Sequence, residues 1–390
     1  MSRTAAPQDQ FHDEVGIGVR GEGGTDGVHH EEADLIISLL ATGLIQAHRQ
    51  VFYGAPLSVP YPPALQRGLD RLSLAAIRSR VPAPAGVPEL VRWCHEPVRS
   101  WPVALGGEEL AGEILMDLGV PTRACHEWAV DAADVESELF ENEVIADVRR
   151  VCRAAGRQDS YVAFRHLVIS TPVLSELEFQ QKLMDPALSV VASMLKQCYP
   201  VAPVECRHDD LVTCCADCGN LLVGSAAGLT CVDDRCTRKS AVRLGRSLPV
   251  AGGVRWLAAP VRTFVASPGR AELRLRDALL RLGADVELWP NFDAYDLRIV
   301  FPGDDVWAVD VKDWSNPVRL ARRLHRIPPE PHWDLSFVVP AREAVAAWPG
   351  YISTLQTWSQ GVRPGLGMAI VSEQQLTTRV RKKLGGTVHA

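Results

Sequence analysis

Residues Asp293–Trp314 read DAYDLRIVFPGDDVWAVDVKDW, and this stretch decides the fold that we predict for the C-terminal third of the chain. Its apolar residues form two short runs, Leu297–Phe301 and Val306–Val311, which the turn residues PGDD join. Short apolar runs on either side of a Pro-Gly turn are typical of a β-hairpin. The sequence therefore predicts two neighbouring strands here.

Charged side chains stand at the ends of these two strands. Asp296 opens the first strand, and Asp310 and Lys312 close the second. Residues two apart in a strand share a face, so Asp310 and Lys312 point the same way and the hairpin can bring Asp296 beside them. Two carboxylates and an ammonium group suit a hard divalent cation and a phosphodiester. The competing interpretation is a surface hairpin whose acids are merely solvated.

This arrangement resembles the PD-(D/E)xK pattern of restriction-endonuclease-like enzymes, with Glu272 on a preceding helix, Pro268–Leu282, as the helical acid. No proline directly precedes Asp296, and the second acid is Asp rather than the commoner Glu. The resemblance implies that Asp296, Asp310 and the Val311 carbonyl hold Mg²⁺ or Mn²⁺. It also implies that Lys312 positions or activates water, and that Glu272 binds a second metal or a metal-bound water.

Strands and helices alternate after the hairpin, which predicts an α/β sheet with helices on both sides and a nuclease domain over residues 259–390. The further elements that we expect are a helix at Pro317–Arg326, a strand at Trp333–Val339, a largely helical segment at Arg342–Trp358, a strand at Gly367–Val371 and a helix at Glu373–Leu384.

Two cysteine pairs, CADC and CVDDRC, predict a zinc ribbon within residues 204–258, a segment that also includes a linker. A zinc knuckle needs a tight turn, and a glycine follows the first pair. The second pair has four intervening residues, so Cys214, Cys206 and His208 are alternative ligands, and buried free thiols are the competing interpretation. The four expected ligands are Cys215, Cys218, Cys231 and Cys236.

Charge distribution says more about partners than the formal net charge of -6 does. Between Arg235 and Arg281 there are 11 Lys or Arg residues and two acids, a balance that suits a phosphate backbone unless these arginines are simply solvated. The residues that we expect to bind nucleic acid are Arg238, Lys239, Arg243 and Arg246 after the cysteines, and Arg319, Arg322 and Arg323 on the helix after the hairpin.

The first half of the chain carries no readable chemistry. Residues 1–30 are polar and Gly-rich, which predicts a mobile leader, and helical patterns dominate residues 31–203, which we interpret as a partner-docking or regulatory domain. Expected helices include Glu108–Leu118 and Val135–Ala155. The tryptophans of this half suit an apolar core better than a ligand pocket.

Composition restricts the cellular compartment and the structural class that we expect for the protein. The 390 residues allow two or three domains, and 47% hydrophobic with 23% charged residues predicts globular cores. No run of 18 apolar residues and no apolar signal core occurs, so we expect neither a membrane span nor export. The ten cysteines, four of them at metal spacing, indicate a reducing cytoplasm.

The whole layout resembles the endonuclease-related protein of prokaryotic PIWI-RE three-gene islands, and YVAFRHLVISTPVL at residues 161–174 is similar to a phrase in the helical part of that family. The resemblance implies a defence system against phage or plasmid DNA, with a PIWI-domain protein and a DinG-type helicase as partners.

We therefore predict a metal-dependent DNA endonuclease. Two alternatives stay open: a catalytically inactive nuclease-like module that binds nucleic acid or a partner, and a zinc-ribbon transcription regulator. The sequence does not choose between DNA and RNA, between single and double strands, or between a monomer and a homodimer, although cutting both strands would usually need two active sites.

Overall fold

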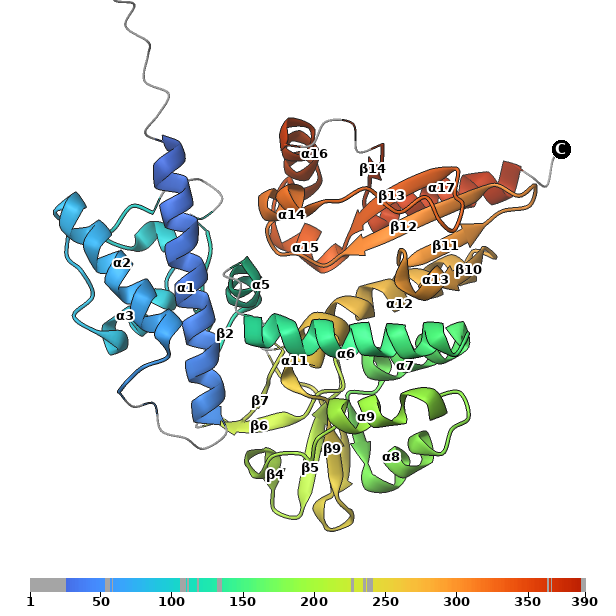
Figure 1. The fold of residues 1–390 in the computed structure, drawn as a ribbon, viewed down its shortest axis with the longest axis horizontal. Coiled ribbons are helices and arrows are strands. Elements are labelled where there is room, and N and C mark those ends of the chain that lie inside the picture. Colours follow the sequence, from blue (N-terminus) through green and yellow to red (C-terminus); the bar gives the residue numbers. More distant parts are fainter. Residues whose placement is uncertain are drawn as a thin grey trace, which may run out of the picture.

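The computed structural model describes residues 26–390 except 53–56, 58, 106–109, 111, 118, 132–134, 226–227, 234–235, 237–240, 363–364, 366 and 387–390. A first apolar core lies within residues 33–129. Helix α1 (Asp26–Phe52) packs along α2 (Pro63–Ser79), with α3 (Val87–Cys94) and α5 (Arg123–Asp131) nearby (Figure 1). Trp101 and Trp128 are buried in this core, as expected for structural aromatic residues.

Two local predictions in this region are wrong. Within the expected helix Glu108–Leu118, Leu110 is helical, but residues 112–115 are not, and Met116–Asp117 form β1, which pairs with β2 (Val120–Pro121); the other residues of the segment lie outside the described ones. Gly119 lies between them with φ +80°, a conformation that favours a turn. Helix α1 begins inside the predicted leader at Asp26, and the rest of that leader lies outside the described residues.

The helices that follow belong to a second, larger core, which they share with the C-terminal sheet. They are α6 (Val135–Ala154), α7 (Gln158–Ser170), α8 (Glu176–Leu183) and α9 (Ala192–Cys198). Phe164 and Val168 of α7 are fully buried in the same core as Leu275 and Val309 of the C-terminal region. The helical segment predicted over residues 31–203 therefore contributes to two separate cores.

Small antiparallel sheets carry the cysteine pairs, and all of their strands except β3 follow α9 in the chain. Their strands are β3 (Val173–Ser175), β4 (Arg207–His208), β5 (Leu211–Cys215), β6 (Leu222–Ser225), β7 (Gly228–Cys231), β8 (Leu244–Pro249) and β9 (Val254–Trp256). The β6–β7 hairpin separates the two cysteine pairs, which is the arrangement that the sequence predicts for a zinc ribbon. Strand β9 pairs with β3, and this pairing ties the segment back to the helices before it.

The C-terminal region is a five-stranded mixed sheet in the order β10-β11-β12-β13-β14. Its strands are β10 (Asp285–Leu288), β11 (Leu297–Val300), β12 (Val306–Lys312), β13 (Leu335–Pro340) and β14 (Ala369–Ile370). The first two pairings are antiparallel and the last two are parallel. The predicted hairpin is β11–β12, and both its strands lie within one residue of their expected bounds.

Helices cover both faces of this sheet, as the sequence predicts (Figure 1). The helices are α12 (Ser267–Arg281), α14 (Pro317–Arg323), α15 (Arg342–Ala347), α16 (Tyr351–Val362) and α17 (Glu373–Gly386). Phe337 and Val339 of β13 share a core with Leu275 of α12, whereas Val338 packs with Leu320 of α14. Alternate residues of β13 thus pack against helices on opposite faces of the sheet.

The contact between α1 and α2 generates a stability prediction. A Cβ atom built on Gly43 would lie 2.3 Å from the backbone nitrogen of Leu65, whereas one on Gly361 of α16 would meet nothing within 4 Å. We expect Gly43→Ala to lower the free energy of unfolding by about 3 kcal/mol, because the helices must separate. The helical control Gly361→Ala should change it by less than about 1 kcal/mol. Urea unfolding measures both, and equal effects would contradict close packing at Gly43.

Candidate active site and metal centre

The β11–β12 hairpin brings Asp296, Asp310 and Lys312 to one edge of the sheet. Leu297 pairs with Val309, so the next residues along the two strands, Asp296 and Asp310, come side by side. The Val311 backbone N–H donates to Asp296 Oδ2 at 2.6 Å, and Lys312 Nζ donates to Asp310 Oδ1 at 2.7 Å. The sheet register therefore assembles the set of charged groups that strand alternation predicts.

Like charges dominate this edge. Burial raises the pKa of Asp296 well above its ordinary value, and the carboxylates of Glu272 and Asp310 add to the effect. Burial acts to lower the pKa of Lys312, but the neighbouring Asp310 and Asp296 carboxylates outweigh it and the net pKa is raised. Lys312 is therefore an ammonium ion at neutral pH, and it offers positive charge rather than a proton-accepting base.

The donor set fits a hard divalent cation. Among the described residues, the Val311 N–H is the only hydrogen-bond donor to Asp296, so the second carboxylate oxygen is open to a ligand. Asp310 carries a single ion pair, and its side chain remains 18% exposed. Carboxylate and carbonyl oxygens are the ligands that Mg²⁺ and Mn²⁺ prefer. A cation here would also offset the repulsion that raises the pKa of Asp296.

Glu272 on α12 occupies a different environment. Its carboxylate accepts two hydrogen bonds from Arg165 Nη2, each at 3.2 Å, and one from the Trp289 indole N–H at 2.5 Å. Burial raises the pKa of Glu272, while Arg165 opposes this shift. Glu272 thus lies near enough to influence Asp296, but its oxygens already accept hydrogen bonds.

Arg165 is a residue of the site that our interpretation of the sequence missed. It lies on α7 with a side chain that is 9% exposed, and it also donates to Asp293 Oδ2 at 2.5 Å. Tyr161 donates to the same oxygen at 2.9 Å. The sequence feature that could have revealed Arg165 is its position inside the apolar run VAFRHLVI, because a helix with such a run buries one face. Such an arginine needs a buried acid as a partner.

The segment that carries Asp293 has an unusual backbone. Trp289, Asn291, Phe292 and Asp293 all have φ between +47° and +78°, a region that non-glycine residues rarely adopt. Gln158 of α7 holds this segment by donating to the Trp289 carbonyl at 2.7 Å and by accepting from the Phe292 N–H at 2.7 Å. Helix α7 therefore fixes the turn that leads into Asp296.

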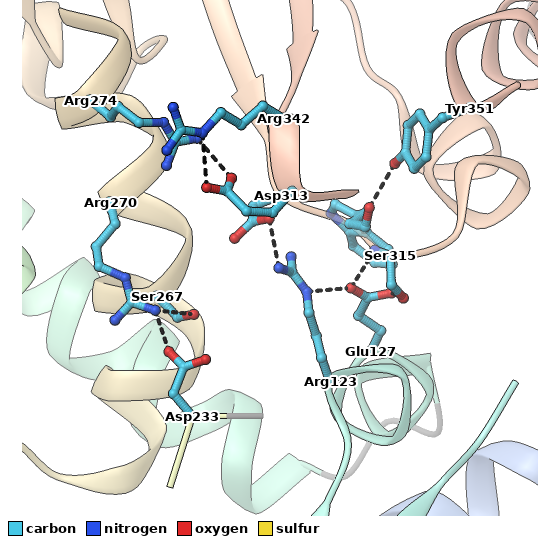
Figure 2. Close-up of polar contacts among 12 residues, drawn as sticks. Arg123, Glu127, Asp233, Ser267, Arg270, Arg274, Asp313, Ser315, Arg342 and Tyr351 are labelled. Carbon is cyan, nitrogen blue, oxygen red and sulfur yellow. Dashed lines mark hydrogen bonds and ion pairs between the residues drawn. The ribbon is translucent and has the colours of Figure 1, made fainter. Parts of the chain in front are cut away.

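The residues after Lys312 are fixed by a second helix (Figure 2). Arg123 of α5 donates to Asp313 Oδ1 at 2.6 Å and to Glu127 at 2.9 Å. The backbone and hydroxyl groups of Ser315 both donate to Glu127, at 2.7 Å and 2.6 Å. Both ends of the β11–β12 hairpin are thus anchored by helices that precede the cysteine region in the sequence.

The residues expected to bind nucleic acid fall into different environments. Arg238 and Lys239 lie outside the described residues. Arg243 pairs with Asp217, Arg246 with Glu178, and Arg322 with Asp34. Arg319 is buried, donates to the Glu127 carbonyl and lies 3.6 Å above the Trp128 ring, so in this conformation it joins α14 to α5 rather than facing solvent. The guanidinium of Arg323 lies 5.4 Å from the centre of the Trp314 ring.

Much of the predicted basic run is also neutralised within the protein. Arg255 pairs with Glu176, Arg270 with Asp233, Arg274 with Glu343 and Glu373, and Arg276 with Asp277. Figure 2 shows Arg270 reaching Asp233, which links α12 to the cysteine region. These pairs weaken the charge argument for a continuous phosphate-binding stripe.

The four predicted zinc ligands come together. The sulfur atoms of Cys215, Cys218, Cys231 and Cys236 all lie within 4.8 Å of one another and are buried. Gly219 follows Cys218 with φ +75°, and its N–H donates to the Cys215 carbonyl at 2.9 Å, which closes the expected tight turn. Hydrogen bonds from Cys231 and Cys236 lower the pKa of Cys218. The cluster can therefore hold a structural zinc ion, with Cys206, Cys214 and His208 outside it.

Comparisons with known protein families match two separate parts of the chain. Residues 269–387 match a family model described as REase associating with pPIWI_RE. Residues 36–175 match a second family model, described as pPIWI_RE three-gene island domain Y. No curated protein and no solved structure matches the chain. Among the described residues no helix is long and apolar enough to cross a membrane.

The cysteine cluster generates a prediction about zinc. We expect one zinc ion per chain by elemental analysis, and loss of that ion in Cys218→Ser with a lower melting temperature, because the metal joins two segments of a small module. Cys214→Ala is a matched control, because Cys214 is buried beside the cluster but is not part of it. Full zinc content in Cys218→Ser would contradict the assignment.

The raised pKa of Asp296 generates a prediction about pH. A carboxyl whose pKa is raised on folding stabilises the protein below its unfolded pKa of about 3.9, and this contribution is lost as the pH rises through the raised value. Mn²⁺ binds the ionised form, so the rise in melting temperature caused by Mn²⁺ should be larger at about pH 7.5 than at about pH 5. Asp296→Asn should abolish this rise. An equal rise at both pH values would count against a metal at Asp296.

Proposed function

We propose that this protein of the pPIWI_RE three-gene islands, which joins a domain Y to a restriction-endonuclease-like domain, is a divalent-metal-dependent DNA endonuclease. The observation that carries the proposal is the edge formed by Asp296, Asp310 and Lys312, where buried carboxylates repel one another and one lysine is held in its charged form. Structural ion pairs are normally balanced, whereas this edge has two carboxylates, Asp296 and Asp310, for the single ammonium group of Lys312.

Each residue has a role that follows from its contacts. Asp296 and Asp310, with the Val311 carbonyl, would hold Mg²⁺ or Mn²⁺, which supplies a polarised phosphoryl oxygen and a more acidic water. The Lys312 ammonium orients the attacking water and offsets the negative charge that develops on the phosphate. The hydrogen bond from Val311 fixes one oxygen of Asp296, so the carboxylate keeps its orientation before substrate binds.

Two alternative functions explain less of this arrangement. A binding module without catalysis has no need to hold two acids and a lysine together at one buried edge. A zinc-ribbon regulator accounts for the cysteines but not for this edge. The repelling carboxylates therefore favour the nuclease.

The family names suggest the setting of this activity. Both matches refer to pPIWI_RE, and one refers to a three-gene island. We propose that the protein acts in the cytoplasm against phage or plasmid DNA, together with a PIWI-domain protein and a DinG-type helicase encoded beside it. A homodimer would place two sites on one duplex and would explain double-strand cleavage.

A cleavage assay tests the proposal. Wild-type protein with Mg²⁺ or Mn²⁺ should cut plasmid DNA in preference to RNA, and Asp310→Asn should lower the rate about 100-fold or more, because it removes one metal-binding charge. Lys312→Ala should have an effect of similar size. Asp304→Asn is the matched control, because Asp304 lies exposed in the turn of the same hairpin.

Full cleavage by Asp310→Asn would refute the assigned site. Absence of cleavage by the wild type, even with the neighbouring gene products and with retained DNA binding, would favour the binding module instead.

A further inference from the structure

Glu272 is the helical acid of the nuclease region, but it is engaged differently from Asp296 and Asp310. Both of its oxygens accept from Arg165 Nη2, and Oε2 also accepts from the Trp289 indole. The Glu272 side chain is 6% exposed and that of Arg165 is 9% exposed. The acid is therefore buried, hydrogen-bonded and balanced by a fixed positive charge.

The guanidinium of Arg165 is itself held from several sides. It lies 4.8 Å from the centre of the Trp289 ring, and its other terminal nitrogen donates to Asp293. Asp293 also accepts from Tyr161 and pairs with Arg149 at 3.3 Å. Residues separated by three, four or seven positions lie on one face of a helix, so Gln158, Tyr161 and Arg165 form a single contact face of α7. This face fixes Arg165 against the active site.

A second metal ion at Glu272 would compete with Arg165 for the same two oxygens, and full coordination of the ion would displace the arginine. Arg165 would then lose one of its two carboxylate partners while it remained buried, and uncompensated buried charge is strongly unfavourable. Within the described residues, the cysteine cluster is the only set of three or more acidic, His or Cys side chains gathered tightly enough to share a metal. Glu272 therefore does not form a compact ligand set with Asp296 and Asp310.

We infer that Arg165 is a positioning residue that takes the place of a second metal ion, so the nuclease site binds one divalent cation. The inference rests on the proposed function, and it assigns to Glu272 a structural pairing instead of the metal-binding role expected from the resemblance. Asp296 and Asp310 then bind the single cation.

The inference also gives a physical reason for joining the two family modules in one chain. Arg165 falls within the domain Y match, and Glu272 falls within the nuclease match. The cation that balances the helical acid is thus supplied by the other module, and α7 packs in the same apolar core as the nuclease sheet. Domain Y would complete the nuclease site as well as dock partners.

The test counts Mn²⁺ ions bound by the zinc-loaded full-length protein, using titration calorimetry and the electron paramagnetic resonance signal of free Mn²⁺. We expect one Mn²⁺ per wild-type chain. Glu272→Gln keeps the shape and the hydrogen-bond acceptor, so it should still bind one ion with a Kd within about threefold of wild type. Asp296→Asn should weaken binding about 100-fold or more. Glu343→Gln, a surface acid paired with Arg274, is the matched control.

Two Mn²⁺ ions per wild-type chain, one of them lost in Glu272→Gln, would overturn the inference and leave the proposed function intact. One ion that is lost in Glu272→Gln would also overturn it. No Mn²⁺ binding by the wild type would refute the proposed metal dependence, and the inference with it.

A second variant tests Arg165 directly. In folded Arg165→Met, the freed Glu272 should take part in binding an additional Mn²⁺, so the count should rise from one to two and return to one in Arg165→Met/Glu272→Gln. A count that stays at one in folded Arg165→Met would show that another group excludes the second ion, and would overturn the role of Arg165. Should Arg165→Met not fold, Arg165→Gln, which keeps a hydrogen-bond donor for Glu272 but no charge, takes its place with the same expected counts.

Discussion

The balance of buried charge is the constraint on which this structure depends. Glu272, Asp293 and Asp296 lie close together with little access to water, and each carboxylate needs a positive charge or a hydrogen-bond donor nearby. Arg165 forms ion pairs with Glu272 and Asp293. Asp296 accepts a hydrogen bond from the Val311 backbone N–H and is stabilised by the positive charge of Lys312. The site is thus divided into a half in which Arg165 pairs with Glu272 and Asp293, and a half in which Lys312 is the cation beside Asp296 and Asp310.

This division of charge explains why helices from the first half of the chain contact the C-terminal sheet. Helix α7 must lie against the C-terminal sheet region because Arg165 cannot be buried without the acids, and the shared apolar core holds it there. The core of residues 33–129 is separate, and polar contacts join it to the sheet region: Arg123 to Asp313, Glu127 to Ser315 (Figure 2).

Some elements were predictable because local chemistry specifies them. The β11–β12 hairpin follows from its apolar runs and Pro-Gly turn, and the cluster of four cysteines follows from their spacing. The expected Glu108–Leu118 helix was wrong over residues 112–117, because a short β-pairing across the turn at Gly119 overrides a weak helical pattern. Arg319 looked available to nucleic acid on the helix face, yet it lies buried above Trp128, since the sequence does not show which face another domain covers.

The sequence by itself determined the strand alternation that places Asp310 and Lys312 together, the turn that returns Asp296 to them, and the cysteine spacing. These features depend on neighbours within a few residues, so backbone geometry fixes them locally. Only the tertiary structure decided that Arg165 balances Glu272 and that α5 anchors the residues after Lys312. Those contacts join residues more than 100 positions apart, and they arise from burial of apolar surface and from pairing of buried charge, which no local pattern records.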